Sequence, residues 1–127
     1  MTGPQGNLAL RTLAMPADTN PNGDIFGGWI MSQMDIAGGL AAKNLSNSRV
    51  STVAVESMTF LNPVKVGDVV CCYADIIRVG NTSMRIKVEV WVLSHPFKSD
   101  GRHKVTEGFF TYVAIDDKGK PIPVNRS

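Results

Sequence analysis

The chain is poor in the residues that most often build metal and redox centres. Its 127 residues include two cysteines and two histidines. Cys71 and Cys72 are neighbours, and neighbouring side chains of a strand point to opposite faces, so we expect no disulfide between them. Neither this pair nor His95 and His103 has the spacing of a metal site. These absences predict a protein without a metal ion in a reducing compartment, the cytoplasm.

Long apolar runs and dense positive charge are absent as well. No apolar stretch of about 18 residues is free of charged side chains, so we expect no membrane span and no membrane partner. Residues 1–6 lack the charged-then-apolar layout of a secretion signal. The net charge is only +2 and no block of lysine and arginine occurs, which argues against a nucleic-acid partner.

The composition that is present is typical of a folded globular domain. Hydrophobic residues make up 43% of the chain and charged residues 19%, which excludes a disordered protein. The length fits one domain over residues 1–127. Within it we expect flexible tails at residues 1–6 and 121–127.

Residues 28–45 have the pattern of a long helix. Apolar side chains recur there at helical spacing, at Ile30, Met34, Ala37, Ala41 and Leu45. Gly38 and Gly39 lie inside this helix, where each costs about 1 kcal/mol against alanine. We therefore expect another part of the molecule to approach the helix closely at this point. Asp35 lies in the same helix, and a carboxylate in a buried helix needs a partner.

The start of this helix and Asp35 suggest a reaction site. Gly28 and Asp35 are seven residues apart, so they lie on nearly the same helix face, about 10 Å apart along the axis. The first N–H groups of a helix have no partner within it and attract negative charge. Gly27 and Gly28 would let a ligand approach this backbone. The alternative is that the glycines form a tight turn and Asp35 pairs with an arginine or lysine.

The rest of the chain predicts an antiparallel sheet. We expect strands at residues 7–15, 50–61, 69–79, 82–93 and 104–115, the last four joined by short connections. One helix against such strands is an α+β fold, with the long sheet curling around the helix. In the fourth strand, alternate residues from Met84 to Val92 form one face, and Arg85, Lys87, Glu89 and Trp91 the other. No second helix covers the sheet, so we expect a homo-oligomer.

Several stretches resemble the YciA-type acyl-CoA thioesterases, which have the hot-dog fold. The resemblance covers about residues 8–118 and lies mainly in residues 10–16, 27–35, 53–58, 66–70 and 110–114. It implies a long central helix wrapped by a curved antiparallel sheet of about five strands. It also implies hydrolysis of acyl-CoA to a free acid and CoA, without metal or cofactor, since CoA is part of the substrate. The expected assembly is a catalytic dimer, with three dimers forming a hexamer.

The resemblance also implies roles for individual residues. Asp35 would be the general base or nucleophile, Gly28 the oxyanion N–H donor, and Asn22 the residue that holds the water or thioester. CoA would contact a strand edge and its loop, at Gly80, Asn81, Thr82, Ser83 and Arg85.

Further candidates follow from residue type. Arg102, His103 and Lys104 form a basic triplet suited to the CoA phosphates. Met58 and Phe60, together with Met31, are candidates for lining an acyl tunnel, since methionine suits irregular chain-binding surfaces.

Two other functions remain open at this stage. A hot-dog dehydratase or hydratase usually pairs a histidine with an acid near the helix, and no histidine precedes His95. A non-catalytic acyl-CoA-binding protein would not need the acid and the asparagine. If Asp35 is not the base, Glu56 and Asp24 are the next candidates.

Overall fold

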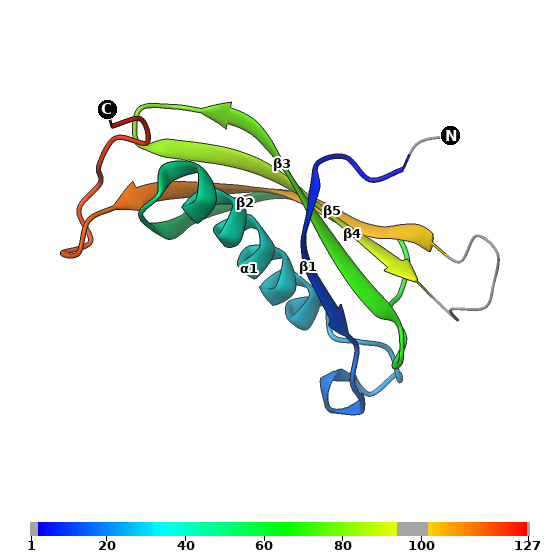
Figure 1. Ribbon diagram of the computed structural model, residues 1–127. Helices are drawn as coiled ribbons and strands as arrows, with labels where there is room; N and C mark the ends of the chain where they lie inside the picture. The colour runs from blue at the N-terminus through cyan, green and yellow to red at the C-terminus, as the bar shows by residue number, and fades with distance from the viewer. Residues whose placement is uncertain (1–2, 94–101, 127) are drawn as a thin grey trace.

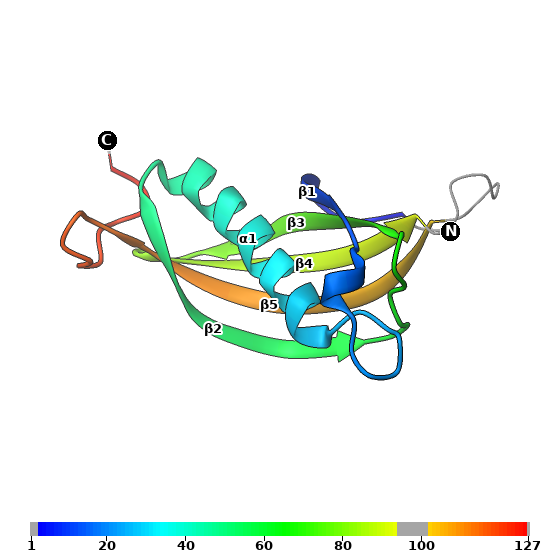
Figure 2. The same cartoon turned by 90° about the horizontal axis from the view of Figure 1, so that it is seen from below.

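The fold is a five-stranded antiparallel sheet that curves around one long helix (Figures 1 and 2). The computed structural model describes residues 3–93 and 102–126; His95 lies outside these ranges. The elements in chain order are β1 (Asn7–Leu13), the short 3-10 helix η1 (Pro16–Asp18), α1 (Gly27–Ser46), β2 (Arg49–Phe60), β3 (Val69–Val79), β4 (Ser83–Leu93) and β5 (Arg102–Ile115). This is the hot-dog arrangement that the resemblance implies.

The order of the strands differs from their order in the chain. The sheet runs β1-β3-β4-β5-β2, and all neighbours are antiparallel. β3, β4 and β5 are consecutive neighbours as expected, but β2 pairs with β5 and not with β3. The short connection of residues 61–68 therefore crosses from one side of the sheet to the other. It passes the start of α1, where the Ile25 N–H donates to the Val64 carbonyl at 2.9 Å.

The core lies between α1 and the concave face of the sheet (Figure 2). The alternation predicted for β4 is confirmed, because its inward residues Met84, Ile86, Val88, Val90 and Val92 are all fully buried. Each such side chain contributes about 1.5–3 kcal/mol by leaving water. The helix ends at Asn47, which adopts a left-handed conformation with φ of 51°. No helix in the described part of the chain has the length and apolar character needed to cross a membrane.

The predicted close approach to α1 is confirmed. A Cβ atom on Gly38 would lie 2.3 Å from the hydroxyl oxygen of Tyr112, and one on Gly39 would lie 3.7 Å from the same ring. Any side chain at Gly38 would therefore push the β5 tyrosine away from the helix. This contact explains the glycine at position 38, whereas a Cβ on Gly39 would make only an ordinary van der Waals contact.

The two cysteines lie on opposite faces of β3, as expected, and both are free and buried. Cys71 is on the outer face, where its sulfur accepts a hydrogen bond from Arg11 Nε at 3.3 Å. Cys72 is in the core. Burial, with the neighbouring Cys71 adding to it, raises the pKa of Cys72 to about 12, so this thiol stays protonated.

The described parts of both predicted tails contact the body of the protein. The Val124 N–H donates to the Asn81 carbonyl at 2.8 Å, and Arg126 donates to the Ser46 carbonyl at the end of α1. Near the middle of β4, Lys87 Nζ donates to Gln5 Oε1 at 3.2 Å. Residues 121–126 thus tie the β3–β4 turn to the helix C-terminus (Figure 1).

Candidate functional site

Asp35 lies where α1 meets β2 and β5, and hydroxyl groups bind it. Its Oδ1 accepts a hydrogen bond from Thr52 Oγ1 at 2.7 Å and one from the Tyr112 hydroxyl at 3.0 Å. Within residues 3–93 and 102–126, its Oδ2 accepts no hydrogen bond and no arginine or lysine pairs with it. The alternative of a structural ion pair therefore does not describe Asp35.

Asp35 opens onto a cavity of about 300 Å³ beside the helix. Its walls come from three elements: Asp35, Ile36, Gly39, Leu40 and Lys43 of α1, Val50 and Thr52 of β2, and Tyr112 of β5. The side chain of Asp35 is half-buried. A carboxylate with one free oxygen at the wall of a mainly apolar cavity can accept a proton or attack a carbonyl group there.

The start of α1 provides free backbone donors. Phe26, the N-cap residue, makes no side-chain cap, and the first helical hydrogen bonds come from Trp29 and Ile30 to the Phe26 carbonyl. In the described part of the chain, no acceptor faces the N–H groups of Gly27 and Gly28. A Cβ on Gly28 would meet no atom within 4 Å. A carbonyl oxygen can therefore approach these donors.

One seam, the line of contact between α1 and β2, connects these two features. β2 leaves the end of α1 and runs back along it, so Thr52 lies beside Asp35 and Phe60 beside Gly27. The edge of the Phe60 ring is 3.4 Å from the place of a Gly27 Cβ. The predicted acid, N–H donors and Phe60 therefore lie along the same seam.

Met58 is less exposed than Phe60 and lies where β2 and β5 pair. A Cβ on Gly108 would lie 2.8 Å from its Cε atom and 3.7 Å from that of Met34. Met58 is therefore partly buried among core residues next to the helix, a position compatible with the end of an acyl chain.

The loop before α1 is organised by Asn20. Its Oδ1 accepts hydrogen bonds from the Asn22 N–H at 2.9 Å and the Asp24 N–H at 3.1 Å. Asn22 is exposed, and its side chain makes no hydrogen bond with any described residue. Asp24 forms an ion pair with Lys65. Asp24 is therefore neutralised, which weakens it as an alternative base.

The residues predicted to contact CoA lie at two ends of β4. Gly80, Asn81 and Thr82 form the turn before it and Ser83 is its first residue, whereas Arg102 and Lys104 pair with Leu93 and Trp91 at its far end. The 11 residues of β4 span roughly 33 Å. The structure does not bring the two groups together within one chain.

The side chains of these basic residues differ in their ion-pair partners and in their exposure to solvent. Arg85 forms an ion pair with Glu56 and lies 4.7 Å from the centre of the Phe109 ring. Lys104 forms an ion pair with Glu107. Arg102 is exposed, with its guanidinium 5.5 Å from the centre of the Trp91 ring. Glu56, the other alternative base, thus faces Arg85 on the outer face, away from the Asp35 cavity.

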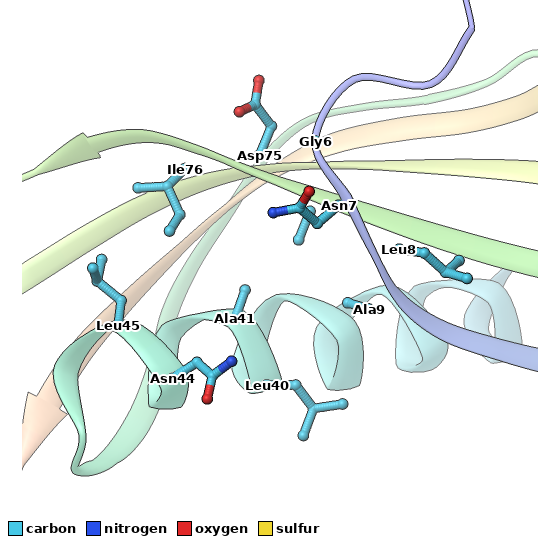
Figure 3. Close-up of a pocket in the computed structure, with 11 residues that line it drawn as sticks. Gly6, Asn7, Leu8, Ala9, Leu40, Ala41, Asn44, Leu45, Asp75 and Ile76 are labelled. Atoms are coloured by element: carbon cyan, nitrogen blue, oxygen red, sulfur yellow. The ribbon is translucent and has the colours of Figure 1, made fainter.

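A larger cavity of about 600 Å³ lies on the other side of α1 (Figure 3). It is lined by residues 6–9, by Leu40, Ala41, Asn44 and Leu45 of α1, and by Ala74, Asp75 and Ile76 of β3. The Asp75 carboxylate points away from the helix (Figure 3). None of the predicted site residues lines this cavity, so its size does not make it the reaction site.

The chain is similar to known thioesterases. Residues 22–95 match the thioesterase superfamily. The acyl-CoA thioester hydrolase YciA of Salmonella typhimurium is 62% identical over 122 residues, which cover 95% of this chain and 92% of that protein. A hexameric thioesterase from Yersinia pestis is 58% identical with a TM-score of 0.91, over 98% of this chain and 99% of its own.

A third relative has been solved with CoA ligands. It is an acyl-CoA hydrolase from Staphylococcus aureus in complex with butyryl-CoA, CoA and CoA disulfide. It is 28% identical with a TM-score of 0.81, over 90% of this chain and 68% of its own. Two variants of it carry alanine in place of an asparagine or a threonine. In sequence, those two positions are separated by the same number of residues as Asn20 and Thr52 in this chain.

Sequence reasoning did not single out Thr52, Tyr112 or Asn20. Thr52 interrupts the apolar positions of its strand, a signal too weak to use alone. The signal for Tyr112 was indirect, because Gly38 and Gly39 predicted a close neighbour without identifying it. Asn20 and Asn22 lie in the same turn-forming stretch, and the sequence does not reveal which of the two organises it.

Proposed function

Because the chain belongs to the thioesterase superfamily, we propose that it hydrolyses acyl-CoA thioesters to a free carboxylic acid and CoA. The observation that supports this most directly is the Asp35 carboxylate, which lines a cavity and whose Oδ2 accepts no hydrogen bond from any described residue. The unpaired N–H groups at the start of α1 lie on the same seam, about 10 Å away along the helix axis. A thioester carbonyl and a water molecule are proposed to bind between them.

In the general-base route, Asp35 Oδ2 takes a proton from water while the water oxygen attacks the thioester carbon. The carbonyl oxygen becomes negatively charged and accepts a hydrogen bond from the Gly28 N–H. The carbon–sulfur bond then breaks, and the proton passes from Asp35 to the CoA sulfur. In the nucleophilic route, Oδ2 attacks the carbon itself, the carbon–sulfur bond breaks and the CoA thiolate leaves and takes a proton from solvent. Water then hydrolyses the resulting anhydride to the free acid and the Asp35 carboxylate. A single turnover in heavy-oxygen water separates the two, since label enters Asp35 only by the anhydride route.

The site is proposed to work in a homo-oligomer, with a dimer as the catalytic unit and three dimers in a hexamer. β2 is an edge strand of 12 residues, and Val53, Val55 and Phe60 on it are all more than 40% exposed. A second copy along this edge would cover apolar surface and close the seam that holds Asp35. Light scattering is expected to give a dimer or hexamer, and an active monomer of 13.7 kDa would contradict this.

Either asparagine before the helix is a candidate for holding the water or thioester. Asn22 has a free side chain, whereas Asn20 holds the loop and matches the spacing of the altered pair in the Staphylococcus aureus hydrolase. Asn20→Ala and Asn22→Ala variants distinguish them. The residue that contacts substrate is expected to lower kcat when changed, while the other variant keeps its kcat.

Release of free CoA tests the proposed function directly. The protein is mixed with an acyl-CoA and a thiol reagent, and CoA is expected to appear in a catalytic excess over protein. A hydratase would consume an enoyl-CoA without releasing thiol, and a non-catalytic binder would bind acyl-CoA without turnover. A cytoplasmic location and independence of metal and cofactor stay predictions, and activity after dialysis against a chelator tests the metal prediction.

A further inference from the structure

We propose that Tyr112 is a positioning residue, which holds Oδ1 of Asp35 in place and thereby presents Oδ2 to the substrate. This inference rests on the proposed thioesterase function. Its starting observation is that two donors converge on one oxygen of the carboxylate, Thr52 Oγ1 at 2.7 Å and the Tyr112 hydroxyl at 3.0 Å. The two oxygens of Asp35 therefore have different environments.

The Tyr112 hydroxyl contacts Asp35 at a second atom. It also donates to the backbone carbonyl oxygen of the same residue at 2.9 Å, so its one proton is shared between this oxygen and Oδ1. One hydroxyl placed between the main chain and the side chain of Asp35 limits the rotation of that side chain. A rotated carboxylate would lose the hydrogen bond, so the other oxygen keeps one orientation.

Tyr112 is well suited to this task because it cannot easily move. Its side chain is 1% exposed, and its ring stacks on Phe110 at 6.3 Å between centres. On the helix side it lies directly against Gly38, where even a Cβ atom would overlap its hydroxyl. Thr52, the other donor, is exposed on the edge strand β2. Of the two donors to Asp35, Tyr112 is therefore the one whose position is fixed by packing.

The Tyr112 hydroxyl also keeps its proton. Burial, and next the negative charge of Asp35, raise its pKa well above the usual value, so it stays a donor at every working pH. A donor to a carboxylate favours the charged form of that carboxylate. The groups that line the site from α1, β2 and β5 include only one other charge, that of Lys43 on α1. The loss of the donor should therefore be visible in the pH profile of the reaction.

The test compares Tyr112→Phe with Tyr73→Phe, which removes the only other tyrosine hydroxyl. Tyr73 lies on β3, paired with Glu89, and does not line the Asp35 cavity. In Tyr112→Phe, kcat for an acyl-CoA is expected to fall about 10- to 100-fold, the usual effect of a hydrogen bond to a charged group. KM is expected to change little. The acid limb of the pH profile of kcat/KM should move to higher pH. Tyr73→Phe should match the wild type in all three.

A double variant shows whether Tyr112 acts through Asp35. In an Asp35→Asn background, Tyr112→Phe is expected to cause no further loss of the residual rate. If Tyr112→Phe does not fold, 3-fluorotyrosine is incorporated into the Tyr73→Phe protein, where Tyr112 is the only tyrosine. The more acidic phenol is a stronger donor, so the acid limb should then move to lower pH.

The outcomes separate this inference from the proposed function. A wild-type protein that releases no CoA from any acyl-CoA contradicts the function itself. An active wild type with an unchanged kcat and acid limb in Tyr112→Phe overturns the role of Tyr112 alone. An equal further loss in the Asp35→Asn background would also overturn it, because Tyr112 would then act independently of Asp35.

Discussion

Two carboxylates lie on opposite sides of the sheet in different surroundings: Asp35 of α1 against its inner face, and Glu89 of β4 on its outer face. On the inner face, neutral hydroxyl groups bind Asp35 through one oxygen, and the residue lines a cavity. On the outer face, Glu89 is 3% exposed and both its oxygens are occupied. Trp91 Nε1 donates to Oε1 at 2.9 Å, while Lys87 and Lys104 lie 3.2 Å and 3.7 Å from Oε2.

The type of partner explains the difference in role. Burial alone would raise the pKa of Glu89, but the hydrogen bonds from Trp91 and Lys87, with the charge of Lys104, bring it below its usual value. Glu89 therefore stays charged and paired, as a structural group does. Asp35 has no ammonium partner in the described ranges, so its charge remains available for chemistry. Three of the four predictions below compare these carboxylates, and the last concerns the rim of the outer face.

The largest effect is expected from Asp35→Asn. The amide keeps the shape of the carboxylate but cannot take a proton or attack a carbonyl. We expect kcat to fall about 10²- to 10⁴-fold, with CoA binding and the circular dichroism spectrum unchanged. Some rate above that in solution should remain, because the N–H groups at the start of α1 are intact. A variant that keeps more than about a tenth of kcat would exclude Asp35 as the base.

The second effect is one on stability, from Glu89→Gln. The amide leaves Lys87 and Lys104 without their shared buried carboxylate, and the cost of breaking such an interaction is about 2–3 kcal/mol. Denaturant unfolding at one protein concentration measures this loss. The kcat of the folded variant should match the wild type. Glu56→Gln is the matched control, since its exposed pair with Arg85 is worth at most about 1 kcal/mol.

The stabilising effect of Glu89 should depend on pH in one direction. Because its pKa is lower in the folded protein than the value of about 4.3 in an unfolded chain, its contribution is complete above that pH. It is lost as the pH falls through the folded pKa. The difference in melting temperature between wild type and Glu89→Gln should therefore be constant near neutral pH and shrink below about pH 4. A difference that grows on acidification would contradict the lowered pKa.

The smallest effects are expected at Arg102 and Lys104, which form a basic rim on the outer face. The guanidinium of Arg102 is exposed, whereas Lys104 is engaged by Glu107 and Glu89. If this rim binds the CoA phosphates, Arg102→Ala should raise KM about two- to fivefold, more than Lys104→Ala does. Binding of CoA should also weaken at high salt. An unchanged KM in both variants would move the phosphate site to Arg85 and the turn at residues 80–83.

Local patterns predicted most of the elements. The helix was expected at residues 28–45 and runs from Gly27 to Ser46, and the bounds of β3 agree fully. Apolar periodicity and turn residues carry this information because they act over a few positions. The pairing of β2 with β5 could not be predicted in the same way, since no local signal relates strands about 50 residues apart.

The same limit applies to the site. Asp35 was recognisable as a carboxylate inside an apolar helix, but its partner Tyr112 comes 77 residues later. Arg85 and Lys87 were predicted to share one face of β4, and both form ion pairs with acids of other strands. Which acid each one pairs with depends on the register of β2, β4 and β5, including its bulges. Register is a property of the folded sheet.

The place of β5 in the sheet has a consequence for the newly made protein. β5 is the last strand in the chain, yet it lies between β4 and β2. At about 5–20 residues per second, a ribosome needs roughly 3–11 s to go from the end of β2 to the end of β5. During this interval β2 has not yet met β5, the strand with which it pairs in the folded sheet. Its apolar side chains can therefore contact chaperones or other nascent copies. Tyr112 emerges after the other described elements of the fold, so the Asp35 site is completed only once β5 has left the ribosome.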